Sequence, residues 1–181
     1  GSETKDFDIA DVANSICDKL IDRHPHIYGD VKVENEDDVK RNWENLKLKE
    51  GKSSVLEGVP KSLPALVKAS RIQDKVSGVG FDWEEPQQVF EKLKEELEEL
   101  QHEVTEDNQD LIEAEFGDVL FSMINYARFL RVNPENALER TNKKFIKRFQ
   151  YLEQKAKQQG KALADMTLTE MDVYWNEAKM L

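Results

Sequence analysis

The sequence predicts an all-α protein, a helical bundle with an N-terminal helical connector, and three observations support this fold class. Charged residues make up 35% of the 181 positions and hydrophobic residues 39%, a balance that is typical of amphipathic helices. Eight glycines and five prolines leave few breaks in the chain. Apolar side chains recur at helical spacing, and no strand pattern competes with them.

The first 60 residues are expected to form the connector. The opening "GS", with no initiator methionine, is typical of the scar left by a cleaved purification tag. Residues 7–23 and 36–50 are predicted helices, and "RHPHIYGD" separates them with a proline and a glycine. Residues 51–62 lack periodicity and are expected to be a linker. The predicted division is therefore 1–60, the tag scar plus a helical connector, and 61–181, a helical domain.

The second region is expected to hold about five helices, each with a start or stop signal. A helix from Pro64 to about Val76 should end at "SGVGFDW", which contains two glycines. Proline suits the first helical turn, so a long helix should begin at Pro86 and run to about Thr105. The other signals are Asp107 or Asn108 capping a helix to Val132, Asn133–Pro134 opening a helix to about Gln159 with Gly160 as its stop, and "TLTE" (Thr167–Glu170) as the capping box of the last helix.

Composition limits the partners and the compartment. The lone Cys17 cannot form an internal disulfide, and no apolar run approaches the about 20 residues that span a bilayer. We therefore expect a cytoplasmic protein without a membrane partner. The formal charge of -11 argues against long nucleic acid, whose binding depends on lysine and arginine at the phosphates.

Charge is unevenly distributed along the chain. Residues 84–118 carry 14 acidic and 2 basic side chains, whereas residues 140–161 carry 8 basic and 1 acidic. An acidic segment followed by a basic one could hold a metal ion and its polyanionic ligand together. The alternative is that both segments are solvated helix faces of opposite sign.

Helix phase separates the glutamates of the segment "EKLKEELEEL". A helix advances about 100° per residue, and five apolar residues of this helix fall within an arc of about 80°. Glu96 lies about 60° and Glu99 about 120° from the centre of that arc. Glu95 and Glu98 lie about 140–160° away and are expected to face solvent. Glu96 should therefore lie at the margin of the buried face, with Glu99 beside it. The five apolar residues are Val89, Leu93, Leu97, Leu100 and Val104.

The next helix combines a broad apolar face with one line of polar side chains. Glu115, Asp118, Ser122 and Asn125 are spaced 3, 4 and 3 apart, so they follow one side of the helix. Glu115 falls within the apolar arc, and Asp118 lies close to its border. An unpaired carboxylate taken out of water costs on the order of several kcal/mol, so these two need a cation, a hydrogen-bond donor or a proton. Most of the apolar face is expected to be buried: Leu111, Ile112, Phe116, Val119, Leu120, Met123, Ala127 and Leu130.

If the two helices pack antiparallel across the short "EDNQD" turn, Glu96 and Glu99 can face Glu115 and Asp118. Four carboxylates then surround one small space. Oxygen ligands suit a hard cation, Mg²⁺ or alternatively Mn²⁺, which keeps some water and takes phosphate oxygens as further ligands. The alternative is that Glu115 and Asp118 reach solvent at the bundle edge while Glu96 extends its head group to water. Spacing alone leaves both interpretations open.

The acidic motif is part of a longer resemblance. "EELEE" (Glu95, Glu96, Glu99) followed by "EFGD" (Glu115, Asp118) fits the pattern EExxE…ExxD. "LPALVKASRIQDKVSGVGFDW" precedes this pattern, "NKKFIKRF" follows it, and "RHPHIYGD" with "NWENLK" lie upstream. EExxE alone is unspecific, because any charged helix can contain it. The ordered set resembles the all-α nucleoside triphosphate pyrophosphohydrolases of the MazG type over essentially the whole chain after the tag scar.

The resemblance implies a four-helix-like fold, a homodimer whose subunits complete each other's sites, and magnesium-dependent conversion of a nucleoside triphosphate and water to the monophosphate and pyrophosphate. This reaction would serve nucleotide-pool house-cleaning. Residues 1–60 contain no EExxE motif, so the chain resembles the C-terminal part of a MazG protein with its connecting segment. The resemblance thus implies that residues 1–60 are a connector from a truncated N-terminal half and that residues 61–181 are the catalytic helical domain.

Site residues are carried over from the family by position. The implied metal ligands are Glu96, Glu99, Glu115 and Asp118, and Glu95 is implied as an outer helper or base that acts with Glu96 and Glu99 in catalysis. The implied substrate-binding residues are Asn125, Lys144, Arg148, Trp175 and Lys179.

Two other classes compete with this interpretation. A non-catalytic helical dimer could act as a regulatory or protein-interaction module, with the acidic cluster as a solvated face. A di-iron bundle needs two Glu-x-x-His motifs, whereas the chain offers only Glu99 to His102. Binding of magnesium plus nucleotide would distinguish the enzyme from the interaction module, because only the enzyme should be stabilised by them.

Overall fold

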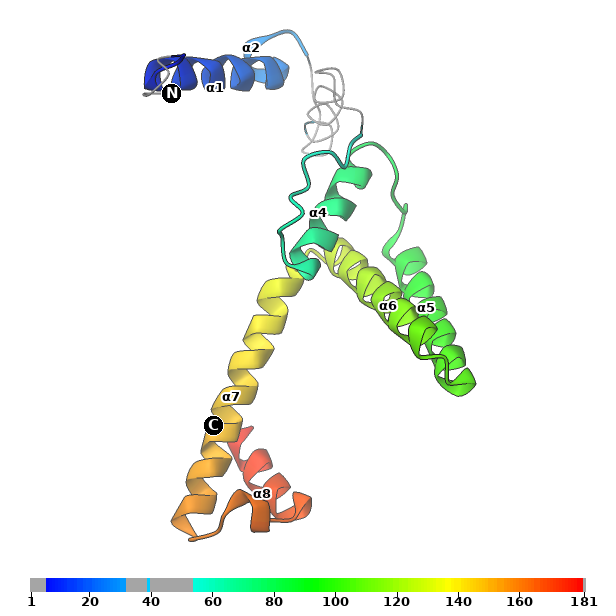
Figure 1. Cartoon of the computed structure of the whole chain (residues 1–181), viewed down its shortest axis with the longest axis vertical. Helices are drawn as coiled ribbons and strands as arrows, with labels where there is room; N and C mark the ends of the chain where they lie inside the picture. Colours follow the sequence, from blue (N-terminus) through cyan, green and yellow to red (C-terminus); the bar gives the residue numbers. More distant parts are fainter. Residues whose placement is uncertain (1–5, 32–38, 40–53, 181) are drawn as a thin grey trace. The chain divides into compact units, whose positions relative to one another are not determined.

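The computed structural model describes residues 6–31, 39 and 54–180, and all regular structure within these ranges is helical, with no strand (Figure 1). This confirms the all-α prediction. The helix expected over 36–50 lies outside the described residues, apart from position 39. Among the described helices, none combines the length and the apolar character needed to cross a membrane.

The chain divides into two units, residues 1–126 and 127–181. The sequence-based boundary after residue 60 falls inside the first unit, and it stays a prediction about domain organisation.

Helix α1 (Ile9–Arg23) begins where the sequence provides a strong cap. The Asp8 carboxylate accepts hydrogen bonds from the backbone N–H groups of Ala10 and Asp11 at 2.8 and 2.9 Å, and Asp11 in turn accepts one from the Asp8 N–H. These bonds satisfy N–H groups that have no partner within the helix. Pro25 then opens the one-turn helix α2 (Pro25–Tyr28), so the expected break contains a helical turn of its own.

Helices α4 (Ala65–Ser77) and α5 (Pro86–Glu106) match their predicted ranges to within one residue. The turn after α4 needs a glycine at position 80, because Gly80 has a φ of 89°. This conformation lets the Phe81 N–H reach the Val76 carbonyl at 3.0 Å. Glu85 caps α5, and Pro86 occupies its first turn as expected.

Helix α6 (Gln109–Phe129) starts after Asn108, whose side chain accepts from the Leu111 N–H at 3.4 Å. It ends three residues before the predicted Val132. Arg131 adopts the left-handed conformation with a φ of 56°, and the Val132 N–H bonds to the Ala127 carbonyl at 2.8 Å. This is a Schellman termination built without glycine, which is why the sequence did not signal it.

The second unit contains α7 (Pro134–Gln158), a short 3₁₀ helix η1 (Leu163–Asp165) and α8 (Leu168–Ala178). Asn133 caps α7, and Gly160 follows its end with a φ of 67°. The Thr167–Glu170 capping box opens α8. All three signals were predicted. Side chains from this unit form a small core of Leu152, Ala156 and Met166.

The packed region of α4, α5 and α6 buries only part of the residues expected in the core. Val89 and Leu93 of α5 and Val119 and Ile124 of α6 are buried. Gln73 of α4 is also buried, and its Nε2 donates to the Phe121 carbonyl of α6 at 2.8 Å. This hydrogen bond ties α4 to α6.

Two expectations about burial need correction. Leu97 and Val104 belong to the predicted buried stripe of α5, but both are exposed in the single chain. The apolar face of α6 is also largely uncovered, with Leu111, Phe116, Leu120 and Met123 exposed, as is Leu130 directly after the helix. Helical periodicity predicts that these residues share a face, but it does not identify the surface that covers them.

Candidate metal and nucleotide site

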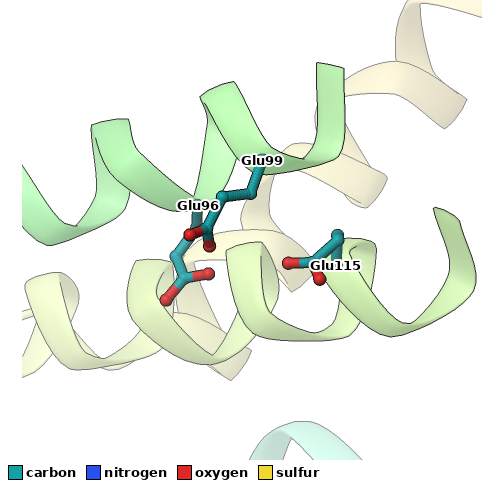
Figure 2. A group of neighbouring side chains, drawn as sticks. All are labelled: Glu96, Glu99 and Glu115. Carbon is teal, nitrogen blue, oxygen red and sulfur yellow. The ribbon is translucent and has the colours of Figure 1, made fainter. Parts of the chain in front are cut away.

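Three carboxylates converge between α5 and α6. These helices lie side by side and run antiparallel (Figure 1), because only Asp107 and Asn108 separate them. Glu96 and Glu99 of α5 and Glu115 of α6 each offer an oxygen, and these oxygens all lie within 4.8 Å of one another. Figure 2 shows the three side chains reaching into the same space from the two helices. The facing of the two acidic motifs was predicted from helix phase and is found here for these three residues.

Burial differs sharply among the three carboxylates. Glu96 is only 7% exposed, whereas Glu115 is half-buried and Glu99 is exposed. Glu96 follows Val89 and Leu93 at spacings of seven and three residues, so it continues the buried stripe of α5. The structure therefore places a carboxylate at a position where α5 could have carried an apolar side chain.

Lys92 provides a cation for this buried carboxylate. Its Nζ lies 3.0 Å from Glu96 Oε1 and 2.7 Å from Glu95 Oε1. The hydrogen bond to Glu95, followed by the one to Glu96, raises the pKa of Lys92 above its ordinary value. Loss of water around the Glu99 carboxyl, and then its proximity to Glu96, raise the pKa of Glu99.

An open, acidic hollow of about 470 Å³ adjoins the cluster. Glu98, His102 and Glu103 line it and had no assigned role in the sequence-based site. They lie three, seven and eight residues beyond Glu95, so their spacing could have placed them along one side of α5. The complete lining is Glu95, Glu98, Glu99, His102, Glu103 and Glu115.

The donor set fits a hard divalent cation. Bonds of about 2.0–2.1 Å in octahedral geometry place neighbouring ligand oxygens about 3 Å apart and opposite ones about 4.2 Å apart. Oxygens within 4.8 Å of one another can meet that geometry through small side-chain rotations. All three donors are carboxylates, which favour such ions over thiolate- or imidazole-preferring metals.

Asp118 and Asn125 do not join the group in this structure. Asp118 is exposed, and the oxygens that lie within 4.8 Å of one another do not include its carboxylate. Asn125 is half-buried on the same helix. Their assignments as metal ligand and substrate-binding residue stay predictions.

The remaining substrate-binding candidates lie in the second unit. The guanidinium of Arg148 lies 5.9 Å from the ring centre of Trp175, and the Phe145 ring packs against that indole with 4.9 Å between ring centres. Lys144 is exposed on α7, and Lys179 Nζ donates to the Asn176 side chain at 2.9 Å. The structure thus brings together Arg148 and Trp175, a cation and an aromatic surface.

The chain is similar to nucleotide pyrophosphohydrolases of the MazG family. A sequence model of the MazG nucleotide pyrophosphohydrolase domain matches residues 1–28 and 84–152, more than half of the chain. The "Nucleoside triphosphate pyrophosphohydrolase/pyrophosphatase MazG" of Thermotoga maritima is 42% identical over 96% of this chain and 66% of its own length. The "Nucleoside triphosphate pyrophosphohydrolase" of Escherichia coli strain K12 is 37% identical over 96% of this chain and 68% of its own length.

A third relative is longer. The "Uncharacterized protein YabN" of Bacillus subtilis is 49% identical over 99% of this chain, but the match covers 37% of that protein. The chain therefore spans about two thirds of the first two relatives and just over one third of the third.

Proposed function

The chain belongs to the MazG nucleotide pyrophosphohydrolase family, and we propose that it hydrolyses nucleoside triphosphates to the monophosphate and pyrophosphate. The single observation that carries this proposal is the convergence of Glu96, Glu99 and Glu115 from two antiparallel helices. The printed names of the two pyrophosphohydrolase relatives support the reaction class. In the cell the reaction would remove unwanted nucleotides from the cytoplasmic pool.

The acidic cluster is proposed as a magnesium site, with manganese as an alternative ion. When bound, the cation would neutralise phosphate charge and lower the pKa of a coordinated water. Glu96, Glu99 and Glu115 would hold it. Asp118, three residues beyond Glu115 on α6, is proposed as the fourth ligand.

A carboxylate at the open side of the cluster is proposed to orient or deprotonate the attacking water. Glu95 and Glu99 both line the acidic hollow, so either can reach a water there. Whichever of the two is less engaged with the metal ion would take this role, because a free carboxylate oxygen can accept a proton from the water. Glu95 is held by Lys92 and is proposed to act as the outer helper.

The second unit is proposed to bind the nucleotide. Lys144 and Arg148 lie four residues apart on α7, so their side chains share one edge of that helix and can contact phosphate oxygens. Trp175 offers an aromatic surface to the base, and Lys179 completes the proposed set in this unit. Asn125, on α6 in the first unit, is proposed as a separate substrate-binding residue. The contact of Arg148 with Trp175 supports this grouping.

The proposed assembly is a homodimer. Phe116, Leu120 and Met123 lie at i, i+4 and i+7 on α6 and are 53%, 44% and 50% exposed, so they form an uncovered apolar stripe. A second copy would cover this stripe and complete the site. Sedimentation velocity would contradict this if the protein remained monomeric at micromolar concentration with nucleotide and Mg²⁺.

The activity has a direct test. ATP and the deoxynucleoside triphosphates should release pyrophosphate in a magnesium-dependent reaction, and Glu96→Gln should lower kcat by at least about 100-fold. The control is Glu91→Gln, which removes the same charge from an exposed position of α5 that pairs with Lys94. Circular dichroism would show whether both variants are folded.

Three outcomes would contradict the proposal: orthophosphate as the first product, activity without a divalent cation, or full activity in folded Glu96→Gln. A panel of canonical, deoxy and oxidised triphosphates would define the substrate. A chain that gains no thermal stability from magnesium plus nucleotide would instead favour the non-catalytic interaction module.

A further inference from the structure

Lys92 occupies part of the acidic cluster, and we propose that it is a tethered cation that competes with the metal ion for Glu96. The inference rests on the proposed metal site and adds a determinant of its affinity. In the metal-free protein Lys92 holds the buried carboxylate; metal binding weakens this ion pair, and Lys92 keeps its contact with Glu95.

The need for such a cation follows from burial. Glu96 has a side chain that is only 10% exposed, and Glu99 and Glu115 bring two further carboxylate oxygens to within 4.8 Å. A buried carboxylate surrounded by like charges is unfavourable unless a cation compensates it. Lys92, four residues before Glu96 on the same helix, supplies this charge at 3.0 Å.

The Lys92 ammonium lies where it would compete with a metal ion for the Glu96 carboxylate. Lys92 Nζ contacts Glu96 Oε1, and an oxygen of Glu96 belongs to the group that can hold a metal ion. An ammonium and a divalent cation repel each other, so they cannot both neutralise the same carboxylate at full strength. Glu95, 2.7 Å from Lys92 Nζ and 56% exposed at its side chain, gives the displaced ammonium a partner outside the cluster.

Lys94 provides a matched comparison on the same helix. Its Nζ pairs with Glu91 at 3.1 Å and lies 4.7 Å from the centre of the Phe90 ring, so its contacts are away from Glu96, Glu99 and Glu115. Lys92→Gln and Lys94→Gln therefore remove the same charge from α5, but only Lys92→Gln removes the cation at Glu96.

The first experiment measures metal affinity directly. Binding of Mn²⁺ to the nucleotide-free protein, followed by electron paramagnetic resonance, should be about five- to tenfold tighter in Lys92→Gln than in the wild type, the range expected for loss of a partly exposed ion pair. Lys94→Gln should change the dissociation constant less than twofold. In addition, Lys92→Gln should unfold at a lower temperature than the wild type in EDTA. Added Mn²⁺ should raise the unfolding temperature of Lys92→Gln more than that of the wild type.

A second measurement uses the unmodified chain and does not depend on how a variant folds. The rate of acetylation of each lysine amine can be followed by mass spectrometry with and without Mg²⁺. The Lys92 amine should react several-fold faster with Mg²⁺ present, whereas the Lys94 amine should keep its rate.

The outcomes separate this inference from the proposed function. If the wild type binds Mn²⁺ but Lys92→Gln binds it no more tightly, or if Mg²⁺ leaves Lys92 acetylation unchanged, the competition is overturned and the metal site stands. If the wild type binds neither ion and Glu96→Gln makes no difference, both the metal site and the competition are wrong.

Discussion

Glu115→Gln should stabilise the metal-free protein and remove most of its response to magnesium. Glu115 is half-buried on α6, and its carboxylate shares a small space with those of Glu96 and Glu99 from α5. Glutamine keeps nearly the same shape and one oxygen, but it removes the charge. Without a metal ion the substitution therefore relieves repulsion; with a metal ion it removes a ligand.

The size of the effect follows from the separation of the oxygens. At 4.8 Å, the distance within which all three oxygens lie, two unit charges in water repel by about 0.9 kcal/mol. Glu115 has two such neighbours, and salt at 0.15 M reduces each term to about half. The expected gain in unfolding free energy is thus about 1 kcal/mol, or about 2–4 °C in Tm for a chain of this length.

The assay is thermal unfolding by circular dichroism, in EDTA and in Mg²⁺. Glu113→Gln is the control, because it removes an exposed charge from the same helix outside the cluster. The wild type should gain stability on adding Mg²⁺, and Glu115→Gln should gain little. The reasoning is refuted if Glu115→Gln melts below the wild type in EDTA, or if it gains as much from Mg²⁺ as the wild type.

Two further predictions concern the second unit. Arg148→Met should lower kcat/KM for ATP about 10- to 100-fold through loss of a charged phosphate contact, whereas steady-state kinetics of Lys147→Met, exposed on the same helix, should match the wild type. A hydrogen bond from Lys161 lowers the pKa of Glu170 from 4.5 to about 2, so ionised Glu170 stabilises the fold above about pH 4.5 and loses this effect as the pH falls through about 2. The wild type should therefore have a higher Tm than Glu170→Gln at pH 7, and this difference should shrink as the pH falls from about 4.5 to about 2. A difference that stays constant over this pH range would contradict the role of Glu170.

Helix starts were the most predictable part of the fold, because each depends on a few adjacent residues. Pro86, Asn133 and Thr167 begin or cap helices where expected. Helix ends were less predictable where glycine is absent. Arg131 adopts the left-handed conformation that usually favours glycine, and its side chain does not indicate this in the sequence, so α6 ends three residues before the predicted Val132.

Helix phase also predicted which glutamate is buried, but it did not identify the cation beside it. It separated Glu96 from Glu95 and Glu98 because the angle around a helix is fixed by position alone. Only the side-chain conformation shows that Lys92 turns toward Glu96, although the four-residue spacing permits that contact.

The sequence also places the exposed apolar residues on one face of each helix without identifying what covers that face. Each of the two helices has an apolar face at helical spacing, which indicates that this face is buried against a partner. Its exposed members are Leu97 of α5 and Phe116, Leu120 and Met123 of α6. Periodicity cannot identify the surface that covers this face, because a second chain satisfies the same pattern as a neighbouring helix does. Glu96 shows the same ambiguity for charge, since its buried carboxylate requires a cation, and either Lys92 or a metal ion meets that requirement. The sequence does not identify the partners of Glu96 or of these apolar residues. Binding of a metal ion or of a second copy is therefore expected to change burial and charge most at these positions.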